Sequence, residues 1–245
     1  MKRPQEIRTA PRNWVRLLQI AYRFLREQEV GDLLLYGSQA MSLYMRSPLR
    51  SKDLDLLSSQ TSLARMEALA EKLAEIEHVE YRTTTVQTRR FDDRKMVTYA
   101  IELRVSSRPF FVELFDSILD ARPLSILQPY IESIERWGFE IWSTNREATL
   151  ALRLAFRQPE GISRLNATRM NSFIRENLRS LDFAYVASIL KDWGVEDWVE
   201  RNLVQLYRRN RLRIINDYLI MPEIERKMKK DINNHSEKRQ RYSRF

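Results

Sequence analysis

The sequence predicts an α/β fold, with a mixed β-sheet and flanking helices followed by a helical C-terminal domain. Three observations support this. Apolar residues recur at helical spacing over residues 13–27 and 61–77. Runs typical of strands lie between and after these two helices. From Arg146 onward the pattern is helical, with breaks at residues 159–161 and at Gly194.

The strands are short and are separated by turn signals. Residues 32–36 predict a buried strand that Gly37 and Ser38 end, and residues 39–46 predict one or two helical turns. Further strands are expected where polar and apolar side chains alternate or where apolar runs are short: residues 51–57, 79–88, 96–105, 109–115 and 139–142, with hairpin loops at 89–95 and 106–109.

The pattern of apolar residues predicts helices in the part of the chain that follows residue 145. They are expected over residues 146–157, 166–191, 195–209 and 211–219. We therefore expect an α/β domain over residues 1–145, a helical domain over 146–224 and a basic, mobile tail over 225–245.

Composition restricts the chemistry. The chain has 245 residues, of which 43% are hydrophobic, with no Cys and 2 His. This excludes disulfides, thiol catalysis and Cys/His zinc sites, so any chemistry must rest on carboxylates, hydroxyls, Arg and Lys. No apolar leader or membrane-length apolar run is visible, which predicts a soluble, cytoplasmic protein with no membrane partner.

The net charge of +9 is concentrated near the C-terminus, where residues 201–245 carry 13 Lys/Arg against 5 Asp/Glu. A basic segment of this kind attracts polyanions, and RNA is the first partner to consider. A solvated charged tail without a partner is the alternative interpretation.

Three carboxylates are candidates for a metal site. Asp53 and Asp55 are two residues apart on a predicted strand, which places both on one face about 7 Å apart. Glu113 is the one charged residue in the apolar run 110–115. If the two strands are neighbours, the three acids form an all-oxygen site that suits Mg²⁺ or Mn²⁺. Alternatively, each acid has a structural role, as a turn cap, a solvent-facing residue or an ion-pair partner of an Arg.

Gly37 and Ser38 follow a buried strand and open a short helix. Free backbone N–H groups at such a position can bind phosphate, glycine lets an anion approach the backbone, and the Ser38 hydroxyl adds a donor. The order strand, Gly-Ser, helix, strand with Asp-x-Asp, and later a strand with a single Glu is more specific than any one of these features.

This order resembles the signature of the DNA polymerase beta-type nucleotidyltransferase fold. The resemblance rests on Tyr36-Gly-Ser-Gln-Ala40, Ser51-Lys-Asp-Leu-Asp-Leu56 and Val112-Glu-Leu114, and covers residues 30–116. It is closest to the nucleotidyltransferase toxins of type IV, abortive-infection toxin–antitoxin systems, and extends more weakly into the helical part. There, Arg153 stands where these toxins carry a functional Lys, and Asp182 lies where they carry an Asp-bearing helix.

The resemblance implies a nucleotidyltransferase that depends on Mg²⁺. In this interpretation Asp53, Asp55 and Glu113 hold the metal and carry catalysis. The triphosphate of an NTP is bound by the residues Gly37, Ser38 and Arg153. The acceptor to test first is an RNA, with tRNA as the first candidate, and a protein hydroxyl is the second; the resemblance also suggests an antitoxin protein as a partner.

Two other functions stay open at this point. The chain can be a non-catalytic protein of the same fold that binds nucleic acid or a partner. It can also be a nucleotidyltransferase that modifies small molecules of the antibiotic type. The three acids favour an enzyme, and the basic C-terminal residues favour a macromolecular substrate.

Overall fold

The computed structural model describes residues 11–77, 80–105, 108–156 and 163–208. It divides into two compact units, Met1–Leu150 and Ala151–Phe245. The division lies inside helix α4 (Arg146–Leu154), five residues beyond the predicted end of the α/β domain at residue 145. The predicted basic tail lies outside the described residues.

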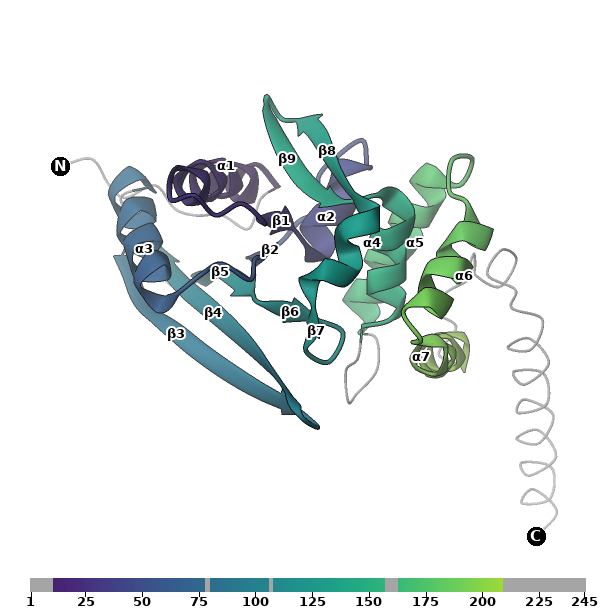
Figure 1. Ribbon diagram of the computed structural model, residues 1–245. Coiled ribbons are helices and arrows are strands. Elements are labelled where there is room, and N and C mark those ends of the chain that lie inside the picture. The colour runs from purple at the N-terminus through teal and green to yellow at the C-terminus, as the bar shows by residue number, and fades with distance from the viewer. Residues whose placement is uncertain (1–10, 78–79, 106–107, 157–162, 209–245) are drawn as a thin grey trace, which may run out of the picture. The chain divides into compact units, whose positions relative to one another are not determined.

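The first unit is built on a seven-stranded mixed sheet with the strand order β3-β4-β5-β2-β1-β9-β8 (Figure 1). Its strands are β1 (Leu34–Leu35), β2 (Asp53–Leu57), β3 (Glu80–Phe91), β4 (Arg94–Val105), β5 (Arg108–Phe115), β8 (Ile131–Arg136) and β9 (Phe139–Thr144). β2 runs parallel to β5 and β1 runs parallel to β9, while the other neighbours are antiparallel. A separate two-stranded sheet pairs β6 (Ser117–Ile118) with β7 (Arg122–Pro123), and a 3₁₀ helix follows at Leu124–Tyr130.

Helices α1 (Pro11–Glu27) and α3 (Leu63–Glu77) pack on one face of this sheet (Figure 1). Both helices carry an apolar stripe at the spacing that the sequence predicted. The buried core includes Trp14, Leu17, Leu18, Ala21 and Leu25 of α1, Met66, Leu69, Ala70 and Leu73 of α3, and Leu54, Leu56, Ile101, Leu103, Phe110, Val112 and Leu114 of the sheet. Burial of this apolar surface is the main source of stability in the unit.

The opposite face of the sheet carries polar side chains, and we call it the acid face. Side chains alternate between the two faces of a strand. Leu54 and Leu56 point into the core, so Asp53 and Asp55 point to the other side. Helix α2 (Gly37–Leu43) lies against this end of β2, where its Gln39 contacts Asp53.

The hairpin of β3 and β4 is longer than predicted. Residues 89–95 were expected to form a loop, but β3 continues to Phe91 and β4 begins at Arg94. The turn consists of Asp92 and Asp93, and Asp92 has a φ of 53°. Aspartate tolerates this left-handed conformation better than most residues, so a tight turn forms and charged side chains continue along both strands.

Two further expectations differ from the structure. β8 was not predicted, because its residues 131–136 are mostly polar and exposed at the sheet edge. The single helix expected over 166–191 is two helices, α5 (Arg164–Asn177) and α6 (Phe183–Asp192). Asp182 separates them, because its carboxylate accepts a hydrogen bond of 3.0 Å from the N–H of Tyr185 and caps α6.

The described part of the second unit is helical. After α4 it contains α5, α6 and α7 (Glu196–Arg208), while the helix expected over 211–219 lies outside the described residues. Within the described part of the chain, no helix has the length and apolar character needed to cross a membrane.

Candidate active site

The parallel pairing of β2 with β5 brings the three acids together. Asp55 is directly opposite Glu113 in this ladder, and Asp53 is opposite Phe111. Residues paired in this way point to the same face, so Glu113 lies beside Asp55 on the acid face. Each of the three residues offers a carboxylate oxygen, and these oxygens lie within 4.8 Å of one another. All three side chains are half-buried.

Asp53 is held in place by two neighbouring side chains. Its Oδ1 accepts hydrogen bonds from the Ser51 hydroxyl and, at 3.2 Å, from the Gln39 Nε2. Gln39 is fully buried, and the same nitrogen also donates to the Ser51 hydroxyl at 2.8 Å. These contacts fix the Asp53 carboxylate toward the acid face without neutralising its charge.

Gly37 is required at its position by Asp55. Its φ is +69°, a conformation that costs side-chain-bearing residues energy. A Cβ added there would lie 2.0 Å from the Asp55 Oδ2 and 2.9 Å from the Asp55 Cγ. The sequence interpretation gave this glycine the role of admitting a phosphate, whereas the structure shows that it first makes room for the Asp55 carboxylate.

Ser38 is the next residue of α2 and is 3% exposed. Its carbonyl oxygen accepts a hydrogen bond of 3.2 Å from the Ser42 hydroxyl. Among the described residues, the Ser38 hydroxyl itself forms no hydrogen bond, which leaves it available to a ligand. Phosphate binding by Gly37 and Ser38 stays a prediction.

The acid cluster gathers three half-buried carboxylates in one place. Burial raises the pKa of Glu113 above its ordinary value, and the Asp53 carboxylate raises this pKa further. Arg89 and Lys52 oppose these effects and lower it. Three half-buried carboxylates whose oxygens lie within 4.8 Å of one another are a donor set that a hard divalent cation neutralises. The residues present therefore fit Mg²⁺ or Mn²⁺.

Arg153, the third predicted nucleotide-binding residue, lies at the end of α4 and is only 9% exposed. Its Cζ is 5.4 Å from the centroid of the Phe156 ring. No carboxylate of the described residues forms an ion pair with it. A buried cation without a carboxylate is costly, so an anionic ligand such as a phosphate would stabilise it. Its role as a nucleotide-binding residue stays a prediction.

Sequence reasoning missed several residues that shape this site. Gln39 could not be identified as a site residue, because nothing in the sequence shows that a glutamine in a short helix will contact Asp53. Ser51 could have been found, since it lies two residues before Asp53 and therefore on the same strand face. Arg89 was expected in a loop and Lys52 was not singled out, although the charges of both residues lower the pKa of Glu113.

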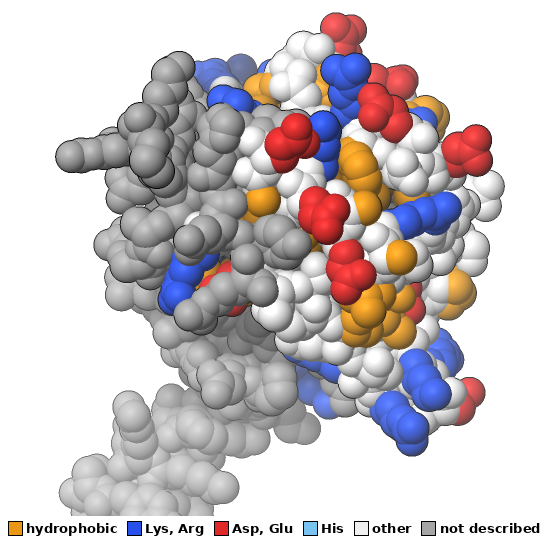
Figure 2. Space-filling view, turned by 90° about the vertical axis from the view of Figure 1, so that its left-hand side faces the viewer, with side chains coloured by type: hydrophobic (Ala, Val, Ile, Leu, Met, Phe, Trp, Pro, Cys, Tyr) orange, Lys and Arg blue, Asp and Glu red, His pale blue; other side chains and the backbone are white. Residues whose placement is uncertain are grey.

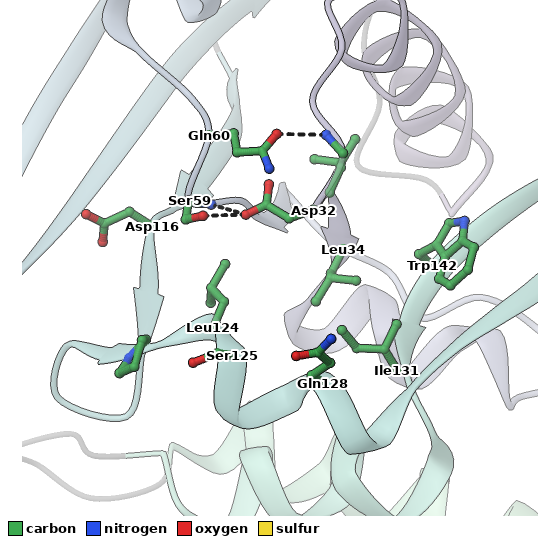
Figure 3. Close-up of a pocket in the computed structure, with 13 residues that line it drawn as sticks. Asp32, Leu34, Ser59, Gln60, Asp116, Leu124, Ser125, Gln128, Ile131 and Trp142 are labelled. Atoms are coloured by element: carbon green, nitrogen blue, oxygen red, sulfur yellow. Dashed lines mark hydrogen bonds between the residues drawn. The ribbon is translucent and has the colours of Figure 1, made fainter.

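A cavity of about 670 Å³ lies at the other end of the same strands (Figure 3). It is lined by residues that include Asp32, Gln60, Asp116 and Trp142, and by none of the predicted site residues. The Asp32 carboxylate accepts hydrogen bonds from the Ser59 N–H at 2.7 Å and the Ser59 hydroxyl at 2.5 Å. These polar groups join the segment before β1 to the turn after β2, which is a structural role.

Comparison with known proteins supports the fold. No protein-family profile matches the sequence, and no curated protein matches it either. Among solved structures, the antibiotic-resistance factor ANT(2'')-Ia matches with a TM-score of 0.50 and 14% identity, over 82% of this chain and 99% of that chain.

Two further matches are weaker. A candidate nucleotidyltransferase from H. pylori has a TM-score of 0.37 and 12% identity, over 78% of this chain and 96% of that chain. An antigenic nucleotidyltransferase-like protein from Paracoccidioides brasiliensis has a TM-score of 0.35 and 12% identity, over 75% of this chain and 91% of that chain. The match to ANT(2'')-Ia shows that this chain has a nucleotidyltransferase-like α/β fold.

The contact between Gly37 and Asp55 generates a first prediction. Gly37→Ala adds a Cβ in a left-handed conformation and against a carboxylate, so it should destabilise the protein by more than the conformational cost of about 1–2 kcal/mol. The matched control is Gly138→Ala, at a φ of +85° with no heavy atom within 4 Å of the added Cβ, which pays the conformational cost alone.

Urea unfolding of both variants, repeated in an Asp55→Ala background, measures the coupling. We expect Asp55→Ala to remove the excess cost of Gly37→Ala and to leave the cost of Gly138→Ala unchanged. Equal costs for the two glycine variants in the wild-type background would show that Asp55 does not approach Gly37.

The raised pKa of Glu113 generates a second prediction, for the metal-free protein. A carboxyl whose pKa is higher in the folded state than in the unfolded state binds its proton more tightly when folded, so stability is lost as the pH rises between the two pKa values. Glu113→Gln removes this loss. Its melting temperature in EDTA should exceed that of the wild type at pH 8, and the difference should shrink at pH 5. A difference that grows toward low pH would mean that the pKa of Glu113 is lowered.

Proposed function

We propose that this protein is a metal-dependent nucleotidyltransferase. The observation that carries the proposal is the cluster of Asp53, Asp55 and Glu113, with oxygens within 4.8 Å of one another on the open face of a nucleotidyltransferase-like sheet. A purely structural role explains this cluster poorly, because no cation of the described residues forms an ion pair with Asp53 or Glu113.

Asp53, Asp55 and Glu113 would hold Mg²⁺ or Mn²⁺, which supplies positive charge for the triphosphate and for the departing pyrophosphate. Ser38 would donate its hydroxyl hydrogen to a phosphate oxygen of the NTP, and Gly37 would let that phosphate approach the backbone. Arg153 would bind a further phosphate oxygen through its guanidinium.

The transfer is an in-line displacement. The hydroxyl oxygen of the acceptor forms a bond to the α-phosphorus of the NTP, and the bond from this phosphorus to the bridging oxygen breaks, so pyrophosphate leaves with the electron pair. The hydroxyl proton passes to a carboxylate of the cluster. Glu113 is suited to receive it, because burial and Asp53 raise its proton affinity.

We further propose an RNA acceptor, with tRNA as the first candidate and a protein hydroxyl as the second. The chain would then act in the cytoplasm as a toxin whose activity a partner antitoxin restrains. Support comes from the resemblance of its motifs to type IV toxins and from the excess of basic residues toward the C-terminus. ANT(2'')-Ia is an antibiotic-resistance factor, which makes transfer to a small molecule the second candidate function.

The proposed function predicts that Asp55→Asn lowers the rate of nucleotide transfer at least about a hundredfold. The variant loses a ligand of the metal ion whose positive charge stabilises the transition state. Incubation with each α-labelled NTP, Mg²⁺ and total RNA, followed by gel separation, measures the transfer. Glu102→Gln is the matched control, since Glu102 pairs with Phe111 on the same face but does not belong to the cluster.

The melting temperature of Asp55→Asn should equal or exceed that of the wild type in EDTA, because repulsion among the acids falls. Equal transfer by wild type and Asp55→Asn would contradict the assigned role. A large loss of stability in Asp55→Asn would show that the acids are structural. If the same incubation with small-molecule antibiotics in place of RNA transfers label, and the incubation with RNA does not, the second candidate function is selected.

A further inference from the structure

The hairpin of β3 and β4 forms one edge of the sheet. Both strands contain 12 residues, whereas β5, the next strand, contains 8. β3 is the terminal strand of the sheet as described, and its side chains from Thr85 to Arg90 are exposed. The hairpin therefore offers an accessible surface that begins beside the acid cluster and leads away from it (Figure 1).

The closed end of this hairpin is basic. Residues 89–95 contain four Arg or Lys side chains and two Asp side chains. The one ion pair found among these described residues joins the sequence neighbours Arg94 and Asp93 at 3.8 Å, and the four basic and two acidic side chains leave a local excess of two positive charges. Figure 2 shows Lys and Arg side chains gathered at the lower end of this view, at the height at which Figure 1 places the closed end of the hairpin.

The strand register divides these basic residues between two faces. Thr85 pairs with Ala100, and Ala100 pairs with Glu113, so all three side chains lie on the acid face. Counting in steps of two along β3 places Arg89 on this face as well, and Arg94, opposite Phe91, shares it. Arg90 and Lys95 are opposite each other and point to the other face.

Arg89 is close enough to act on the acid cluster. It lies four residues beyond Thr85, about 13 Å along the strand, and two strands from β5, about 10 Å across the sheet. The side chain spans part of this distance, and its charge lowers the pKa of Glu113. A few nucleotides of an extended polynucleotide cover the same distance.

We propose that the acid face of the β3–β4 hairpin, with Arg89 and Arg94, binds the phosphate backbone of an RNA acceptor and directs a ribose hydroxyl toward the acid cluster. This inference rests on the proposed function and names the surface that binds its RNA acceptor. Guanidinium groups bind phosphate in a bidentate manner, and the uncharged Thr85 and Gln87 lie between Arg89 and the acids, where they can donate hydrogen bonds to sugar or base.

RNA fits this surface better than an acidic protein does. The acceptor must carry negative charge for Arg89 and Arg94, yet it must present a neutral hydroxyl at the acid cluster, because the carboxylates repel further anions. An RNA strand carries both groups in a regular repeat. A small acceptor that carries positive charge would be repelled by these arginines.

The test compares two double variants of the full-length chain with the same change in charge. Arg89→Gln/Arg94→Gln alters the acid face, and Arg90→Gln/Lys95→Gln alters the opposite face of the same hairpin. Binding of a fluorescein-labelled 20-nucleotide single-stranded RNA is measured by anisotropy across a salt series, without NTP or Mg²⁺.

Each lost phosphate contact lowers the log–log salt slope by about 0.7, which corresponds to about fivefold in affinity at 0.1 M salt. We expect Arg89→Gln/Arg94→Gln to lose one to two contacts, and Arg90→Gln/Lys95→Gln to lose fewer. Both variants should stay folded, as circular dichroism measures, and Arg90→Gln/Lys95→Gln should keep the melting temperature of the wild type and its affinity for a non-hydrolysable NTP.

Equal affinities and slopes for the two variants would overturn the inference, as would a wild-type protein that does not bind RNA. The same assay is run with fluorescein-labelled polyglutamate. If Arg89→Gln/Arg94→Gln weakens binding to polyglutamate but not to RNA, the partner is an acidic protein and the inference is wrong. Because binding is measured without transfer, a failed transfer assay rejects the proposed function alone. Active transfer to RNA with unchanged binding by Arg89→Gln/Arg94→Gln rejects this inference alone.

Discussion

The register between β2 and β5 is the constraint on which the site depends. Asp55 and Glu113 are on different strands, 58 residues apart in sequence, and they meet because the two strands pair residue for residue. A slip by one residue would turn Glu113 into the core and Val112 toward the acids. The core prevents this slip, because Leu54, Leu56, Val112 and Leu114 are all fully buried against α1 and α3. Apolar packing on one face of the sheet therefore positions the charges on the other face.

Close packing around the acids completes their positioning. Gly37 lets the Asp55 carboxylate lie directly against the backbone of α2, and Gln39 and Ser51 hold the Asp53 carboxylate. None of these groups is a cation. These three contacts orient the carboxylates without supplying positive charge, while Arg89 and Lys52 lower the pKa of Glu113. Holding three half-buried carboxylates close together is costly to the folded protein, and a bound divalent cation lowers that cost.

The fold class and the three candidate acids could be predicted from the sequence because both depend on patterns of neighbouring residues. Alternation of Asp53, Leu54, Asp55 and Leu56 predicts a strand with one charged face, and a lone Glu in an apolar run is conspicuous. The hydrogen bonds of Gln39 could not be predicted from the sequence, because they depend on how α2 packs over β2. The charges at residues 89–95 indicated a loop, although exposed edge strands often carry charged side chains. The break before α6 contains no Gly or Pro, but Asp182 is a capping residue and could have indicated it.

The central claim is that the three carboxylates form one cation site, and calorimetric titration of the metal-free protein with Mn²⁺ tests it most directly. Wild-type protein and Glu102→Gln should bind Mn²⁺ in a saturable way, with affinity that rises between pH 5 and pH 8 as Glu113 loses its proton. Asp55→Asn and Glu113→Gln should weaken this binding at least about tenfold. Wild-type affinity for Mn²⁺ in these two variants, or no binding by the wild type, would contradict the account.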